Sequence, residues 1–263
     1  MSTEQRSLKP LIIGLAAAIA VVVAVIGVGV YVMNRPEENQ APEPTFPSAA
    51  PEPEQDLDAR GYNAPRSDAV GRKVMVPRNG VGQPLDQDPA GSKGFDDPGA
   101  FTEPAAGIEW QQTGGVVTPF STSDGPTRMD GKTPRGFART PAGAALASAT
   151  YTWRLMDGSL ASEAVEKTFD PATENYQQAV EVTAKMGPGD TVGDKMPRPS
   201  GYEVSQDKCD PDYCAPTFSM PLPDGTSQSI PGAAVVWVDG DWKGVYTPAG
   251  ESRQGTDAGL VRW

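Results

Sequence analysis

An apolar run from Leu11 to Met33 constrains this chain more than any other feature of its sequence. The run reads LIIGLAAAIAVVVAVIGVGVYVM and contains no charged residue and no proline. As an α-helix it would be about 34 Å long, enough to cross a hydrocarbon core of roughly 30 Å with some tilt. We therefore expect a transmembrane helix over residues 11–33, and the lipid bilayer is the first partner that the sequence implies.

Two other interpretations of the run are a buried core helix and a cleavable signal peptide. Core helices of this length are rarely apolar on every face. A signal peptide has a shorter apolar region that ends in a small-x-small cleavage site. This run instead ends in Tyr31-Val32-Met33 and is followed by Asn34-Arg35. The sequence favours an uncleaved anchor over both alternatives.

The charges that flank the run indicate its orientation. Arg6 and Lys9 lie in the short segment 1–10, whereas the other side has Arg35 followed at once by Pro36-Glu37-Glu38. Positive charge collects on the cytoplasmic side of a membrane span. We expect a single-pass protein of the cell membrane, with residues 1–10 as a cytoplasmic tail and the C-terminal domain on the extracytoplasmic side.

The chain is acidic, and part of that charge is concentrated after the apolar run. The net charge is −12, and residues 36–58 contain seven acidic residues and no Lys or Arg. Dense Pro and Glu favour an extended, disordered chain that cannot build a core. We expect residues 34–106 to be a Pro-, Gly- and acid-rich stalk with partly ordered loops, including a possible short strand at Lys73–Val76. An acidic exterior domain repels phosphate backbones, so nucleic acid is not an expected partner.

Residues 107–263 carry the signals of a folded domain. Thr140 and Pro141 suit the N-cap and first position of a helix that continues to about Met156. Further helices are expected at 160–167 and from Asp170 to about Met186. Strand patterns follow Gly201, and the clearest is a hairpin of residues 233–238 and 241–246. Helices followed by antiparallel strands predict an α+β domain, which we expect to form a cone of helices packed on a curved antiparallel sheet.

The turn of that hairpin and the start of the first helix give two sharper expectations. Asp239-Gly240 stands between two β-rich runs, which is typical of a type I′ turn. Gly143 is tolerated in a helix only at a cost of about 1 kcal/mol relative to Ala, so a close approach to the helix backbone would explain it. We expect the sheet to be the element that approaches Gly143.

The residues that commonly carry chemistry are sparse. The chain has no His, which excludes Ser-His-Asp and Cys-His arrangements and most zinc sites. The Asp96-Asp97 and Asp239/Asp241 pairs are better explained by turns than by acid–base catalysis. Cys209 and Cys214 are expected to form a local disulfide outside the cytoplasm. We expect no catalytic residue, cofactor or metal, and therefore not an enzyme.

Four segments in this order resemble a known family. They are Trp110-Gln111-Gln112 leading to the Gly-x-Val-x-x-Pro stretch Gly114–Pro119, then Gly125-Pro126-Thr127, the segment GFARTPAGAALA at 136–147, and VWVDGDWK at 236–243. They are similar to single-pass membrane proteins of actinobacteria, mostly of unassigned function and often linked to integrative conjugative elements. The motif positions in this chain are Gly136, Phe137, Thr140, Pro141, Gly143, Trp237, Asp239, Gly240 and Trp242.

The resemblance implies a cone like that of nuclear transport factor 2 and kinship with inner-membrane subunits of type IV secretion machines. The expected function is a non-enzymatic, membrane-anchored scaffold subunit of a conjugation or secretion apparatus. Its partners would be other envelope or secretion proteins or further copies of itself. The alternative is a cell-surface binding module for a peptide, lipid or cell-wall fragment. A genomic neighbourhood of coupling ATPase or relaxase genes would favour the first function, and a transporter or cell-wall operon the second.

Overall fold

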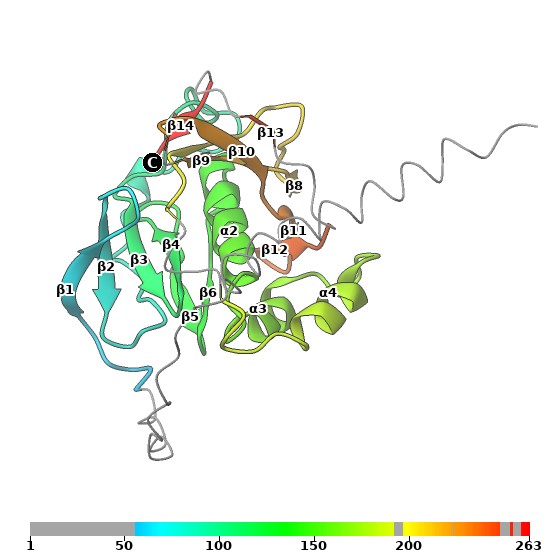
Figure 1. Ribbon diagram of the computed structural model, residues 1–263. Helices are drawn as coiled ribbons and strands as arrows, with labels where there is room; N and C mark the ends of the chain where they lie inside the picture. The colour runs from blue at the N-terminus through cyan, green and yellow to red at the C-terminus, as the bar shows by residue number, and fades with distance from the viewer. Residues whose placement is uncertain (1–55, 192–196, 223, 248–252, 255–258) are drawn as a thin grey trace, which may run out of the picture. The chain divides into compact units, whose positions relative to one another are not determined.

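In the computed structural model, helix α2 (Pro141–Arg154) lies at the centre of the fold, and all of its residues are buried (Figure 1). Its start follows from the sequence, because Thr140 Oγ1 accepts a hydrogen bond from Gly143 N at 2.8 Å and Pro141 stands in the first turn. Its Ala, Gly, Ser and Thr side chains are short, so strands can approach it on several sides. The helix predicted to begin after Thr140 is confirmed.

The structure describes residues 56–191, 197–222, 224–247, 253–254 and 259–263, which belong to one compact unit, Glu54–Trp263. The predicted tail at 1–10, the predicted transmembrane segment at 11–33 and the first part of the predicted stalk lie outside these residues. Within the described ranges, no helix combines the length and apolar character that a membrane span requires.

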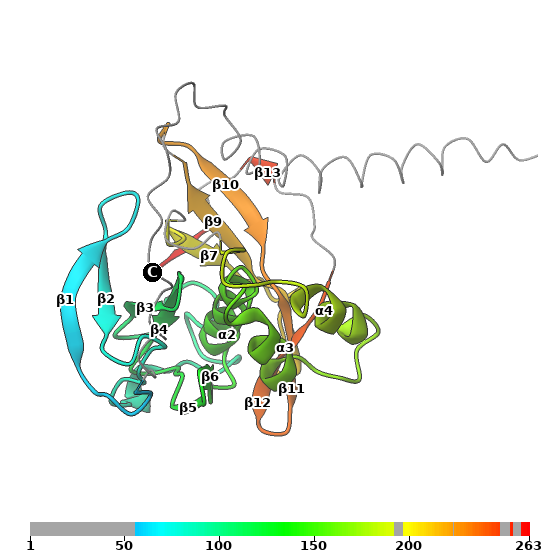
Figure 2. The same ribbon diagram turned by 60° about the horizontal axis from the view of Figure 1, so that its bottom comes forward.

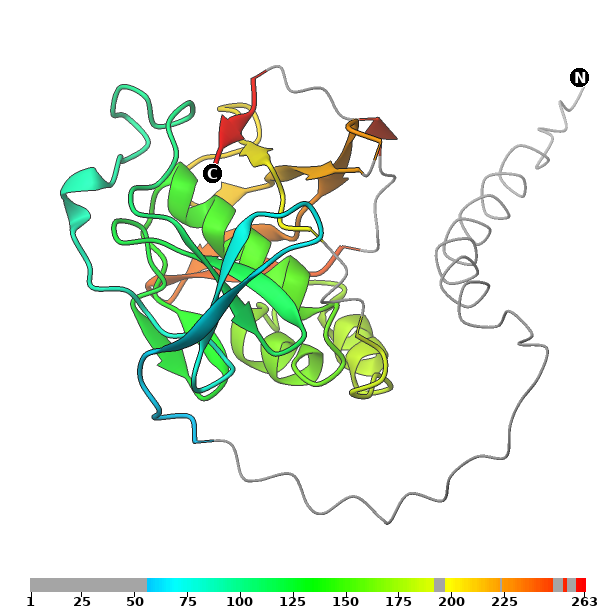
Figure 3. The same ribbon diagram turned by 60° about the vertical axis from the view of Figure 1, so that its left-hand side comes forward.

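A four-stranded mixed sheet packs on one side of α2 (Figure 3). Its strands, in spatial order, are β1 (Tyr62–Ser67), β2 (Lys73–Pro77), β3 (Glu109–Thr113) and β4 (Val116–Phe120). Neighbours are antiparallel except for β2 and β3, which run parallel. Every residue of β4 is buried, and within this sheet β4 is the strand that packs most closely on α2.

This sheet corrects the predicted domain boundary. We expected the domain to begin at residue 107 and residues 34–106 to be stalk and loops, but β1 and β2 are part of the first sheet and the compact unit begins at Glu54. The short strand expected at Lys73–Val76 is present as β2. Pro65 and the mostly exposed side chains of β1 hide the strand pattern, since β1 gains its order by pairing with β2 rather than by burying an apolar face.

The remaining strands form two further sheets and a small hairpin. The order in the five-stranded sheet is β13 (Arg253–Gln254), β10 (Ser227–Pro231), β9 (Thr217–Pro221), β7 (Gly201–Glu203) and β14 (Val261–Arg262). The three-stranded sheet contains β12 (Asp241–Val245), β11 (Ala234–Val238) and β8 (Tyr213–Cys214). The hairpin pairs β5 (Arg128–Asp130) with β6 (Thr133–Arg135), and a short 3-10 turn, η1, covers Pro89–Gly91.

Two further helices lie beside β11 and β12 (Figure 2). Helix α3 (Ala161–Thr168) confirms the helix expected at 160–167. Helix α4 (Tyr176–Thr183) begins later than predicted, because Asp170 does not cap a helix. The Asp170 Oδ1 atom instead accepts a hydrogen bond from Ala172 N at 2.9 Å in a local turn, and the Asp170 N–H donates to Gly244 O at 2.9 Å.

The β11–β12 hairpin forms with the predicted turn. Asp239 and Gly240 have φ values of 54° and 76°, both in the left-handed region that a type I′ turn requires. This register places Trp237 opposite Trp242, and their rings meet edge to face at 5.3 Å. With three α-helices and several sheets among the described residues, the predicted α+β class is confirmed.

Candidate binding pocket

The two segments that carried the resemblance pack against each other. The Asp241 carboxylate accepts hydrogen bonds from Gly136 N at 3.0 Å and from Phe137 N at 3.3 Å. From the same strand, Trp242 Nε1 donates to Ala138 O at 2.8 Å. Phe137 and Trp242 are both buried, so the motif residues of the two segments form a structural junction at the start of α2.

Asp241 was assigned by sequence to turn chemistry, and the structure shows that this interpretation is wrong. Its side chain is 1% exposed and forms ion pairs with Arg135 at 2.9 Å and Arg128 at 3.3 Å. Asp239, by contrast, is an exposed turn residue as expected. Sequence reasoning missed Asp241 because its ion-pair partners stand more than a hundred residues earlier in the chain.

Cys209 and Cys214 form the predicted disulfide. The loop between them contacts Arg139, the residue that precedes the N-cap of α2. Arg139 Nε donates to Pro211 O at 2.9 Å, and the Arg139 guanidinium forms an ion pair with Asp212. The same guanidinium lies over the Trp237 ring, 5.5 Å from its centroid. The disulfide loop therefore packs on the outside of the junction between the two motif segments.

Several buried titratable groups serve the fold. Arg154, at the end of α2, is 1% exposed and its Nη2 donates to Val81 O at 3.0 Å, which fixes the helix to the loop after β2. Burial lowers the pKa of Arg154 to about 10, so it stays protonated at neutral pH. Burial also raises the pKa of Tyr151, whose hydroxyl donates to Trp242 O at 2.8 Å. These groups are engaged internally and do not form a reactive cluster.

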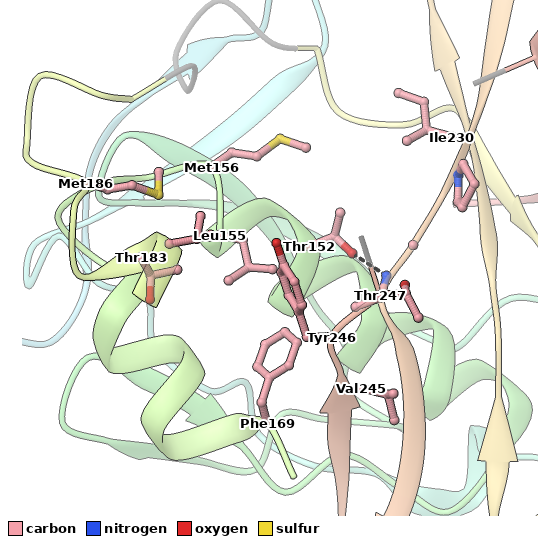
Figure 4. Close-up of a pocket in the computed structure, with 14 residues that line it drawn as sticks. Thr152, Leu155, Met156, Phe169, Thr183, Met186, Ile230, Val245, Tyr246 and Thr247 are labelled. Atoms are coloured by element: carbon pink, nitrogen blue, oxygen red, sulfur yellow. Dashed lines mark hydrogen bonds between the residues drawn. The ribbon is translucent and has the colours of Figure 1, made fainter. Parts of the chain in front are cut away.

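An apolar pocket opens between the C-terminal end of α2, helix α4 and the ends of β10 and β12 (Figure 4). We call it the α2–α4 pocket. It has a volume of about 290 Å³. Its larger apolar lining residues are Leu155, Met156, Phe169, Val182, Met186, Ile230, Val245 and Tyr246. The Phe169 and Tyr246 rings lie next to each other, and Met156 and Met186 lie at the opposite end from Phe169 (Figure 4).

The polar atoms at this pocket are largely occupied by the protein itself. Thr152 Oγ1 accepts from Ala233 N at 2.8 Å and donates to Ser148 O at 2.7 Å. Thr183 Oγ1 donates to Ala179 O at 2.9 Å. Among the described residues, no Asp, Glu, Lys or Arg lines the pocket and no cluster of His, Cys, Asp or Glu is suited to a metal ion. The surface is suited to binding an apolar group.

Little in the sequence predicts the α2–α4 pocket. Met156 and Met186 stood at predicted helix ends, and Tyr246 closed the predicted hairpin, but the lining comes from four separate elements. A signal that was present is the pair of flexible methionines, which are common on binding surfaces that adapt to their ligand.

Comparisons with curated proteins and with solved structures find no match to this chain. One family model matches, over residues 75–261, so the match begins within β2 and covers nearly everything after it. The chain belongs to this family, which is described as a domain of unknown function, DUF8175.

Proposed function

We propose that this chain is a non-enzymatic, single-pass membrane protein that serves as a scaffold subunit of a conjugation or type IV secretion-like envelope apparatus. The apolar run at 11–33 supports the anchor. The disulfide between Cys209 and Cys214 suits an oxidising compartment outside the cytoplasm. The resemblance to actinobacterial membrane proteins supports the kind of apparatus. The kinship with a nuclear transport factor 2-like cone is supported by the packing of α2 and α3 on β12.

The α2–α4 pocket is the observation that best supports a binding role. A scaffold subunit must hold a partner, and this pocket offers an uncharged, apolar recess on the exterior domain. Val182 at the pocket is 44% exposed, although it is a large apolar side chain. We propose that an apolar side chain of another envelope protein enters the pocket, since burying such a side chain contributes about 1.5 to 3 kcal/mol.

The same pocket supports a second candidate function, a surface binding module for a lipid, peptide or cell-wall fragment. A volume of about 290 Å³ with an apolar lining and a few hydroxyl groups is suited to a small apolar ligand. The two functions differ in whether the purified protein binds such a ligand by itself.

Val182→Glu is expected to release the full-length chain from its envelope complex. A carboxylate at the pocket must be desolvated when an apolar side chain enters, so we expect affinity for the partner to fall at least about tenfold. Val70→Glu is the matched control, because Val70 is 43% exposed on the β1–β2 turn and does not line the pocket. Both changes are at exposed positions and should alter stability by at most about 0.5 kcal/mol.

The measurement is the size of the complex in detergent-solubilised membranes, with its other subunit identified. The wild type and Val70→Glu should migrate with that subunit, and Val182→Glu should migrate as the free chain. An unchanged complex in Val182→Glu would refute docking at this pocket. If the complex is unchanged but the purified variant no longer binds an apolar fluorescent dye that the wild type binds, the second candidate is favoured.

A further inference from the structure

Three arginines from distant parts of the chain line a second pocket, which we call the arginine pocket. It has a volume of about 300 Å³ and is lined by Arg72, Arg198, Pro199, Ser200, Arg262 and Trp263. Arg72 follows the β1–β2 turn, Arg198 precedes β7, and Arg262 lies in β14, whose end lies near that turn (Figure 2). None of these residues lines the α2–α4 pocket, so this site is independent of the proposed docking role.

Arg72 holds the pocket together. Its Nε donates to Asp68 Oδ2 at 2.9 Å, and its Nη1 donates to Pro199 O at 3.3 Å. Its Nη2 also donates to Arg198 O. Burial acts to raise the pKa of Asp68, but hydrogen bonds from Arg72 lower it overall, so this carboxylate stays ionised. Arg72 therefore uses most of its donors to join the β1–β2 turn to the segment before β7.

Arg198 is oriented but much less fully paired. Its guanidinium lies over the Trp110 ring, 5.9 Å from the centroid. Its Nη1 makes a long hydrogen bond of 3.5 Å to Lys73 O, and its Nε is 3.9 Å from Asp68 Oδ2. Its Nη2 has no acceptor among the described residues. A planar guanidinium that is held in place with free donors is preorganised for an oxyanion.

The charges that act on Arg198 are unbalanced. Burial lowers the pKa of Arg198, the charge of Arg72 lowers it further, and the opposing influence of Asp68 is smaller than that of Arg72. Among the described residues, Asp68 therefore does not fully compensate the positive charge that Arg72 adds at Arg198. The imbalance stands out in a chain whose net charge is −12, where a cationic cluster does not follow from the overall composition.

We propose that the arginine pocket binds an oxyanion, a phosphate or carboxylate group, at the guanidinium group of Arg198 and beside the Trp263 ring. The Trp263 ring is held in place by Tyr202 at 4.5 Å and Trp110 at 5.3 Å, which makes it a fixed wall. The same chemistry has two possible sources, the head group of an anionic phospholipid and a free anionic ligand. Charge-assisted hydrogen bonds from the Arg198 guanidinium would supply the affinity.

The test follows the indole N–H signal of Trp263 by NMR in the full-length chain. The chain has five Trp residues and therefore five such signals, which mutation can assign. The Trp263 N–H is buried and has no acceptor among the described residues, so its signal is sensitive to nearby charge. One arm titrates inorganic phosphate into the protein in uncharged detergent at constant ionic strength. The other compares lipid nanodiscs of phosphatidylcholine with nanodiscs that also contain phosphatidylglycerol.

We expect a saturable shift of the Trp263 signal in at least one arm, and the arm that responds identifies the source of the anion. Arg198→Gln, which removes the guanidinium group that makes only long polar contacts with Lys73 O and Asp68, should weaken the binding about tenfold, the effect of losing one charge-assisted hydrogen bond. Lys208→Gln removes the same charge from an exposed position outside the pocket and should leave the binding unchanged. An unchanged Trp263 signal in both arms, or equal weakening by the two variants, would overturn the proposal.

Discussion

Gly143→Ala is expected to lower the free energy of unfolding of the folded domain by about 3 kcal/mol, the upper part of the usual cost of overpacking. A Cβ atom at this position would stand 2.1 Å from Ala138 O. That carbonyl cannot withdraw easily, because it accepts hydrogen bonds from Thr140 N at 2.9 Å and from Trp242 Nε1 at 2.8 Å. The substitution forces either the helix or this junction to move.

The measurement is denaturant unfolding of the full-length chain followed by tryptophan fluorescence. All five Trp residues lie between positions 110 and 263, so the signal reports the unfolding of the compact unit Glu54–Trp263. Gly189→Ala is the control, because a Cβ there would meet nothing within 4 Å, and its effect should be within about 0.5 kcal/mol. If Gly143→Ala were neutral or stabilising, as helix propensity alone would predict, the close approach would be refuted.

Asp241→Asn is expected to cost about 3 to 5 kcal/mol of stability, because removing one partner of a buried ion pair leaves an uncompensated charge. Asp241 Oδ2 accepts from Arg135 Nε at 2.9 Å and Gly136 N at 3.0 Å. An Asn amide keeps the shape but loses the charge and turns one acceptor into a donor. Arg135→Met in the Asp241→Asn background should recover part of the loss, since it removes the unpaired cation.

Asp239→Asn provides the contrast two residues away. Asp239 is exposed and has a φ of 54°, which Asn tolerates. We expect a change within about 0.5 kcal/mol by the same unfolding measurement. If Asp241→Asn and Asp239→Asn lowered the free energy of unfolding by similar amounts, the Asp241 ion pairs would contribute no more to stability than the exposed turn residue does.

The positions discussed above show what local sequence patterns can and cannot predict. Thr140-Pro141 and Asp239-Gly240 act through their own backbone, so the helix start and the hairpin turn were predictable. The importance of Gly143 was predicted, but the group that approaches it is the carbonyl of Ala138 in the helix's own lead-in and not the sheet. The role of Asp241 depends on Arg135, which is 106 positions away, and no local pattern reveals such a pair.

The same limit explains why strand β1 and the two pockets could not be predicted from the sequence. Strand β1 is mostly exposed and contains Pro65, so only its pairing with β2 identifies it. The α2–α4 pocket and the arginine pocket each combine side chains from elements that are distant in the sequence. Their residue types are ordinary one by one, and only the fold brings them together.

The account depends most on an anchored chain with its domain outside the cell, and thiol labelling in intact cells tests this directly. Cys209 and Cys214 are the only cysteines and are bonded to each other, so a membrane-impermeant maleimide reports an introduced thiol alone. We predict that Val70→Cys, 43% exposed on the domain, is labelled in intact cells, and that Ser2→Cys is labelled only after permeabilisation. Labelling of Ser2→Cys but not of Val70→Cys in intact cells would contradict the proposed topology, and with it the role outside the membrane.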